Sequence, residues 1–256
     1  MNILLVAGAN PLNKNGNPIF LDLAIKTKNK LNKHKVSIAV DTWNDDLVSF
    51  TNNRKKNDKL FNFLSKYLMR AYELVFLQRK YRNISKGRYE NLNKFVNFSG
   101  GINSSKFKEY ILEENFDLII CFAVSIVQKN TLEVGKYKFI NLHPGILPEY
   151  KGIGNFWAVL NKDYENIGIT IHWMNEKIDD GKIISIQKLQ TKFSSLWQMN
   201  INSFEIGIEE LERLINKENI YEIQTISNSI SKYYGWYGIF EYFKFKKSVK
   251  ELHLEI

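Results

Sequence analysis

Short apolar runs alternate with amphipathic stretches along most of the chain. Residues 3–7 (ILLVA) and 117–123 (DLIICFA) are continuous apolar runs, which is typical of strands that are covered on both faces. Further β-prone runs occupy residues 36–40, 138–142, 168–174 and 183–189. Polar segments rich in Gly and Asn separate these runs, so each one is expected to form its own strand.

Helical spacing appears between the strand-like runs. It predicts helices at residues 19–32, 105–114, 129–134 and 197–217. Ser104 or Ser105 is a suitable N-cap for the second of these helices. The alternation of strand, helix and strand favours an α/β fold built on a parallel sheet.

The longest predicted helix spans residues 55–77 and coincides with the most basic part of the chain. Its apolar positions from Leu60 to Val75 form one stripe, wide enough to pack onto the domain or onto a second subunit in a homodimer. Residues 54–88 carry eleven Lys or Arg and two acidic residues, a sum of +9 that equals the net charge of the whole chain. A solvated helix face is the first interpretation, and a docking surface for a polyanion is the second.

Composition narrows the class of protein. Hydrophobic residues make up 44% and charged residues 25% of the 256 residues, which is ordinary for a globular protein. The apolar runs are too short to span a membrane, and the N-terminus resembles a first strand, not a signal peptide. One cysteine, Cys121, lies in an apolar run and is expected to be buried and reduced. These features predict a cytoplasmic protein without membrane insertion.

Asn141 and His143 are the first candidates for chemistry. They lie two residues apart at the end of a predicted strand, so their side chains share one face, and Pro144 stops the strand directly after them. The carboxyl edge of a parallel sheet is where α/β proteins bind ligands. The alternative is that both side chains only tie down the following loop, and the local pattern leaves the two interpretations open.

Asp179 adds a carboxylate from the loop KIDDGK between two later strands. A carboxylate can hold an imidazole in one tautomer, and an amide can donate a hydrogen bond to an oxygen that gains negative charge. Such a set suits acyl transfer to an amine. By itself the combination is weakly specific.

The order of the motifs resembles the folate-dependent formyltransferase family. The stretch INLHPGILPEYKG, followed by GITIHWMNEKIDDGKII, matches the pattern Asn-x-His-Pro-(Ser/Gly)-x-Leu-Pro, then Gly-x-Thr-x-His, then Asp-x-Gly. The family includes glycinamide ribonucleotide, methionyl-tRNA and nucleotide-sugar formyltransferases. The resemblance covers roughly residues 117–187 and implies a Rossmann-like fold, with 10-formyltetrahydrofolate as formyl donor and no metal.

The resemblance also implies roles for particular residues. Asn141, His143 and Asp179 correspond to the catalytic triad of the family. The loop of Val124, Ser125, Ile126 and Val127, together with Asp179, corresponds to the folate site. Lys151, Gly152 and His172 correspond to substrate-binding or supporting positions, and the Leu147–Pro148 bond to a cis peptide.

The same resemblance suggests a domain organisation and an acceptor. A formyltransferase catalytic domain is expected over residues 1–190, with an insertion at about 41–103. Residues 191–256 are expected to form a small C-terminal appendage, made of a helix and an aromatic-rich tail. They lack the alternating strands of the barrel found in the transfer RNA enzymes, so no nucleic acid partner is expected.

The run HPGILPEYKGIGNFWAVLN looks most like sugar N-formyltransferases of surface-polysaccharide pathways. The expected acceptor is therefore a nucleotide-linked amino sugar. Three alternatives stay open: formylation of methionyl-tRNA, formylation of glycinamide ribonucleotide or an amino acid, and an inactive binding protein.

Overall fold

A computed structural model describes most of the chain. It covers residues 1–9, 18–42, 60–72, 95–98, 101–134, 138–190, 192–217, 220–227 and 232–254. Most of the expected insertion at 41–103 and most of its basic residues lie outside these ranges.

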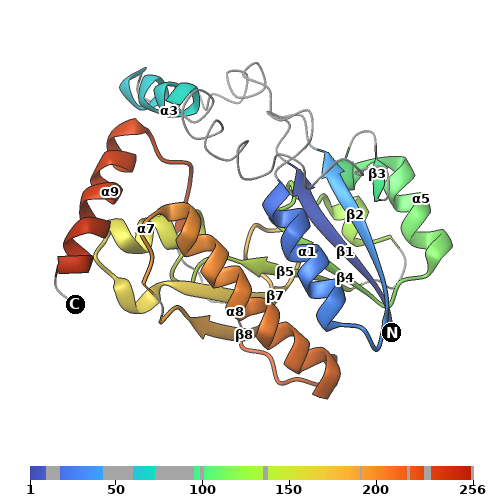
Figure 1. Ribbon diagram of the computed structural model, residues 1–256. Coiled ribbons are helices and arrows are strands. Elements are labelled where there is room, and N and C mark those ends of the chain that lie inside the picture. Colours follow the sequence, from blue (N-terminus) through green and yellow to red (C-terminus); the bar gives the residue numbers. More distant parts are fainter. Residues whose placement is uncertain are drawn as a thin grey trace.

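One mixed sheet organises the described residues (Figure 1). Its seven strands run in the order β3-β2-β1-β4-β5-β7-β8. Their bounds are β1 Asn2–Ala9, β2 Lys35–Thr42, β3 Val96–Phe98, β4 Leu118–Phe122, β5 Lys138–His143, β7 Gly168–Trp173 and β8 Ile183–Lys188. The first five are parallel to one another, whereas β7 is antiparallel to both β5 and β8. The parallel α/β prediction is therefore confirmed, with an antiparallel hairpin added at one edge.

Alternating side chains of β1 belong to two different hydrophobic cores, one on each face of the sheet. Ile3, Leu5 and Ala7 belong to the core beneath α1 (Pro18–Lys30) and α8 (Leu196–Lys217). Their neighbours Leu4 and Val6 belong to the core beneath α5 (Ser105–Glu114). A strand that is buried on both faces has no polar side to alternate with, which explains the continuous apolar runs. Cys121 lies in the second core, where burial raises the pKa of its thiol.

The predicted helix boundaries agree with the structure where it describes them. Helix α5 begins after Ser104, whose hydroxyl accepts a hydrogen bond from the backbone N–H of Phe107 at 3.2 Å. The shorter helices are η3 (Gly101–Asn103), α6 (Lys129–Leu132), α7 (Gly154–Leu160) and η4 (Tyr164–Asn166). Within the part of the chain that is described, no helix combines the length and the apolar character that a bilayer span requires.

The apolar stripe expected on the long basic helix packs differently from the prediction. The described portion, α3 (Leu60–Tyr72), lies against α9 (Ile239–Leu254). It buries Ser65 and Met69, while Leu64 and Leu68 of the expected stripe are exposed. Ser65 Oγ lies only 2.1 Å from where a Cβ on Gly238 would be. Ser65 on α3 thus packs against the glycine that directly precedes α9, a close approach that a larger side chain at either position would prevent.

The C-terminal segment is fastened to the rest of the molecule by aromatic stacking and a short sheet. Phe156 on α7 stacks on Tyr237 and on Phe245 of α9, with ring centroids 3.9 and 5.0 Å apart. Strand β9 (Tyr233–Tyr234) pairs in parallel with β6 (Lys151–Gly152). The aromatic-rich tail therefore packs directly beside the motif loop that begins at Pro144.

A substitution on α9 tests this attachment. Phe245 is 1% exposed in the aromatic cluster, so Phe245→Ala is expected to lower the free energy of unfolding by about 3–5 kcal/mol. Phe243, two residues earlier and half exposed, is the matched control, and its replacement by Ala should cost less than half as much. Urea unfolding of both variants measures the difference, and equal losses would contradict burial of α9 against α7.

Candidate active site

Two neighbouring strands bring four polar side chains to the same edge of the sheet. Asn141 and His143 sit two residues apart on β5, which ends where Pro144 follows. The antiparallel partner β7 aligns His172 with Asn141 and Thr170 with His143. Cross-strand partners lie close enough for direct side-chain contact, so the register of this one pair of strands assembles most of the site.

The connection between β7 and β8 brings Asp179 back over these residues. Asp179 has a φ of 49°, a left-handed conformation that Asp tolerates better than most side chains. Gly181 allows the tight return, because a Cβ there would lie 1.6 Å from the carbonyl oxygen of Trp173. Replacement of this glycine would therefore push the loop, and Asp179 with it, away from the strand.

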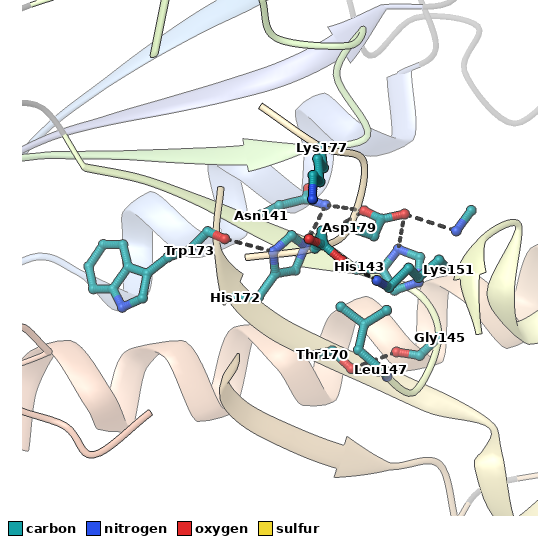
Figure 2. A network of polar contacts seen from close by, with 12 residues as sticks. Asn141, His143, Gly145, Leu147, Lys151, Thr170, His172, Trp173, Lys177 and Asp179 are labelled. Carbon is teal, nitrogen blue, oxygen red and sulfur yellow. Dashed lines mark hydrogen bonds and ion pairs between the residues drawn. The ribbon is translucent and has the colours of Figure 1, made fainter. Parts of the chain in front are cut away.

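The Asp179 carboxylate contacts both strand residues (Figure 2). Its Oδ2 lies 3.4 Å from His143 Nδ1 and accepts a hydrogen bond from the backbone N–H of Gly152 at 2.9 Å. Its Oδ1 faces the Asn141 amide, with Nδ2 at 3.5 Å. The structure thus brings together the three residues expected from the sequence as a triad.

His172 fixes the orientation of the Asn141 amide. His172 Nδ1 lies 2.9 Å from the carbonyl oxygen of Trp173, an acceptor only, so this nitrogen donates. In the neutral ring Nε2 is then an acceptor, and the Asn141 amide donates to it across 3.2 Å. The opposite amide orientation would turn the oxygen of Asn141 towards Asp179, so the N–H groups of Asn141 point into the site.

His143 is held from its other side by the chain. Its Nε2 lies 2.8 Å from the carbonyl oxygen of Tyr150, which fixes a proton on Nε2. The ring is 3% exposed, and burial lowers the pKa of His143 even though the Asp179 carboxylate acts to raise it. A neutral His143 therefore presents the lone pair of Nδ1 on the side of Asp179.

Asp179 stays ionised in this environment. Burial acts to raise its pKa, but the positive charge that His143 and His172 carry when protonated, together with the hydrogen bond from the Gly152 N–H, outweighs burial and holds the pKa well below its usual range. The result is a buried negative charge beside an imidazole that can take up a proton and an amide donor. Such a cluster can accept a proton and can stabilise an oxygen that gains negative charge.

Lys151 is less available than the sequence suggests. Its side chain is buried, and its ammonium group forms an ion pair with Asp180. Asp180 therefore differs from its neighbour Asp179, because its carboxylate neutralises the buried positive charge of Lys151. Lys151 can contact an anionic ligand only if Asp180 shares it.

The predicted cofactor loop lies beyond the end of β4 and is separate from the triad. Ile126 at its tip is 66% exposed, whereas Val127 is buried. Val124, Val127 and Met174 pack in the same core, and Met174 stands shortly before the loop of Asp179. The two loops therefore flank one edge of the sheet.

Three further residues near these loops do not stand out in the sequence. Asp41 and Asn103 hydrogen-bond to the 124–128 segment, and Tyr233 of β9 lies against Gly152. For Asp41 a signal was present: a single acid directly after the apolar run VSIAV, at the same sheet edge as Asn141. Asn103 and Tyr233 lie in segments without clear helical or strand spacing, so the sequence does not predict where they lie in the fold. Among the described residues, no group of three His, Cys, Asp or Glu side chains is arranged to hold a metal ion.

Comparison with known proteins identifies related sequences. The sequence model of a family described as formyl transferase matches residues 24–194. A methionyl-tRNA formyltransferase of Methylacidiphilum infernorum is 34% identical over 95 residues, or 37% of this chain and 28% of the relative. A GDP-perosamine N-formyltransferase of Brucella melitensis is 32% identical over 116 residues, or 43% of this chain and 44% of the relative. The chain thus matches less than half the length of these curated relatives.

Solved structures with a similar fold extend over nearly the whole chain. A sugar N-formyltransferase from Shewanella has a TM-score of 0.56 at 16% identity, covering 97% of this chain and 88% of the other. An N-formyltransferase from Helicobacter canadensis, solved with folinic acid and dTDP-3-aminofucose, has a TM-score of 0.52 at 17% identity. It covers 92% of this chain and 71% of the other. At such low identity these similarities establish the fold.

The buried imidazole makes stability depend on pH. Because the folded-state pKa of His143 is lowered, the unfolded chain binds a proton first as the pH falls below about 6.5, and stability decreases. His143→Gln should therefore show a smaller loss of stability than the wild type between about pH 7.5 and about pH 5.5. Urea unfolding at both pH values measures this difference.

Asp179 does not interfere with that measurement. Its folded-state pKa is depressed, so its contribution to stability is complete above about pH 4 and is lost only in stronger acid. An identical pH dependence for His143→Gln and the wild type would show that His143 is not held in its neutral form.

Proposed function

Because the chain belongs to the formyl transferase family, we propose that it transfers a formyl group from 10-formyltetrahydrofolate to the primary amine of a nucleotide-linked amino sugar. The observation that carries the proposal is the buried Asp179 carboxylate, which contacts both His143 Nδ1 and the Asn141 amide. These groups supply what acyl transfer to an amine needs: a proton acceptor and a donor for a developing negative charge.

In the proposed mechanism each residue of the triad has a separate task. One Asn141 N–H donates to His172, and the other, which faces Asp179 across 3.5 Å, would turn to donate to the oxygen that gains negative charge during the attack of the amine. His143, with its Nε2 proton held by Tyr150, keeps Nδ1 free to accept a proton or a hydrogen bond. The Asp179 carboxylate stabilises a positive charge on either the imidazole or the attacking amine.

The 124–127 loop fits a folate at the neighbouring position. It combines an exposed apolar side chain at Ile126 with backbone groups that are held in place, which suits the flat, amide-like edge of a pterin. Val124, Ser125, Ile126, Val127 and Asp179 would contact the cofactor. When bound, 10-formyltetrahydrofolate supplies an activated formyl group.

The aromatic tail favours a sugar nucleotide as acceptor. Tyr233 is half exposed and lies against Gly152, whose N–H binds Asp179. Burial raises the pKa of Tyr233, with a further contribution from the negative charge of Asp179, so the phenol stays neutral beside the site. An exposed aromatic ring can stack on a sugar or a base. Lys151 and Gly152 lie in the strand that pairs with Tyr233 and would also face the acceptor.

Two further observations bear on the acceptor. The fold neighbour from Shewanella, which this chain covers almost completely, is described as a sugar N-formyltransferase. Formylation of methionyl-tRNA is the second candidate, because several curated relatives have that name and the net charge of +9 suits a polyanion. A role in surface-polysaccharide synthesis belongs to the first candidate only.

A panel of acceptors distinguishes these proposals. The protein is incubated with 10-formyltetrahydrofolate and, separately, with nucleotide-linked amino sugars, methionyl-tRNA and glycinamide ribonucleotide. Mass spectrometry then detects the addition of one formyl group. Formylation of an amino sugar supports the proposal, and formylation of methionyl-tRNA alone would replace it. The absence of formyl transfer to every acceptor in the panel would refute the proposal and leave an amino acid acceptor or the binding-protein alternative.

Substitutions in the triad test the mechanism. His143→Ala and Asp179→Asn are each expected to lower turnover at least ~100-fold, the size of effect that loss of a positioned acid–base group has. Circular dichroism confirms that the variants are folded before rates are compared. Near-normal turnover in either folded variant would refute the assignment of the triad.

Tyr233 tests the acceptor side. Tyr233→Ala is expected to raise the acceptor KM at least about fivefold, the lower end of what loss of one stacking contact causes. The KM for 10-formyltetrahydrofolate should stay unchanged, and Tyr233→Phe should keep the wild-type acceptor KM. Phe243→Ala, which removes a half-exposed ring from α9, is the control. An unchanged acceptor KM in Tyr233→Ala would exclude Tyr233 from the acceptor site.

A further inference from the structure

We propose that Asp41 and Asn103 are positioning residues for the folate: they hold the 124–128 loop in the conformation that binds the pterin. The inference rests on the proposed function and goes beyond it. Neither residue belongs to the motifs of the triad or of the loop. Asp41 comes from the end of β2, and Asn103 comes from the 3₁₀ turn η3 that precedes α5.

Asp41 binds the first half of the loop. Its carboxylate is 1% exposed, and Oδ2 accepts hydrogen bonds from the backbone N–H of Ser125 at 2.7 Å and from the Ser125 hydroxyl at 2.9 Å. Its Oδ1 accepts from the backbone N–H of Ile102 at 2.7 Å. A buried carboxylate needs such donors, so Asp41 locks the loop and the η3 turn to the same strand end.

Asn103 binds the second half. Its Nδ2 donates to the carbonyl oxygen of Ile126 at 2.8 Å, and its Oδ1 accepts from the backbone N–H of Gln128 at 2.8 Å. The same Oδ1 accepts from the hydroxyl of Thr131 at 3.1 Å. One amide side chain therefore uses both its donor and its acceptor to fix the backbone on either side of Val127.

Close packing against the end of β1 restricts the start of the loop. A Cβ on Gly8, at the end of β1, would lie 1.9 Å from the carbonyl oxygen of Ala123. Ala123 itself has a φ of 49°, a left-handed conformation that is uncommon for alanine. The chain thus leaves β4 through a strained residue that is pressed onto β1, and Asp41 and Asn103 then determine where the next five residues lie.

The fixed conformation of the 124–128 loop is expected to raise the affinity for the cofactor. Ile126, the residue between the two clamps, is the exposed apolar tip, and its carbonyl oxygen is the atom that Asn103 holds. Release of either clamp would let the tip and its backbone groups occupy several conformations. The cofactor would then have to order the loop, and its affinity would fall. The triad is anchored to other elements and would keep its geometry.

Paired variants separate the two halves of the Asn103 clamp. Asn103→Asp keeps the acceptor for Gln128 but replaces the donor to Ile126 with an oxygen, whereas Asn103→Ala removes both. Asp41→Asn keeps the size of the side chain and turns N–H groups towards the donors of Ser125 or Ile102. Each variant is expected to weaken binding of folinic acid about tenfold, the order of magnitude for loss of one or two hydrogen bonds that hold the loop.

A matched control comes from the opposite edge of the sheet. Asn2 also uses its side-chain Nδ2 to hold backbone carbonyls, those of Glu114 at 2.7 Å and Asn115 at 3.4 Å, at the start of β1. Asn2→Ala removes a comparable set of bonds far along the strands from the loop. It should leave the affinity for folinic acid within about twofold of the wild type, while it lowers stability by a comparable amount.

Calorimetric titration with folinic acid and hydrogen exchange of the 124–128 amides form the test. The inference is supported if the Asp41 and Asn103 variants exchange faster there and bind about tenfold more weakly, with the acceptor KM unchanged. It is overturned if the variants bind folinic acid like the wild type, or if the KM for donor and acceptor rise equally. If the wild type itself does not bind folinic acid, the proposed function fails and this inference fails with it. If the wild type binds and the variants bind equally well, only this inference fails, so the two outcomes are distinguishable.

Discussion

The buried carboxylate of Asp179 requires hydrogen-bond donors, and this requirement determines how the residues at this edge of the sheet are arranged. Asp179 carries a negative charge in a site that is largely closed to water, and an unpaired charge there would be strongly destabilising. Its hydrogen-bond donors come from two separate elements, Asn141 on β5 and the backbone N–H of Gly152 on β6, and the rings of His143 and of His172 near the end of β7 lie 3.4 and 3.7 Å away. A conformation that satisfies Asp179 therefore brings the ends of β5 and β7 and the strand β6 together.

The antiparallel hairpin at the sheet edge makes this arrangement reachable. A parallel strand in place of β7 would need a long crossover connection before the next strand. The tight β7–β8 connection instead returns over β5 within a few residues and delivers Asp179 above the strand that carries Asn141 and His143. The same register aligns His172 with Asn141, so one pair of strands sets both the donor and the carboxylate that faces it.

The two halves of the site are held by different means. The triad is held by strand register and by charge, and its members contact one another directly. The 124–128 loop is held by polar side chains from β2 and η3, which lie before it in the chain and belong to no recognised motif. The tail closes a third side through β9 and the aromatic cluster of α7 and α9.

The sequence by itself determined the local elements and the motif residues. Continuous apolar runs identified the buried strands, a serine identified the start of α5, and the resemblance of the motifs to a family singled out Asn141, His143 and Asp179 as the expected triad. These features depend on neighbours in the sequence, or on a spacing that a family repeats.

Only the tertiary structure decided which distant groups meet. In it, α3 buries Ser65 and Met69, while Leu64 and Leu68 stay exposed, because Met69 fills the aromatic core that includes Phe245 and Ser65 fits against Gly238. It compensated Lys151 with Asp180, and it brought Asp41 and Asn103 to the loop after β4. Such contacts join residues tens of positions apart, and no periodicity within one segment encodes them. They follow from the order in which the strands are packed into the sheet.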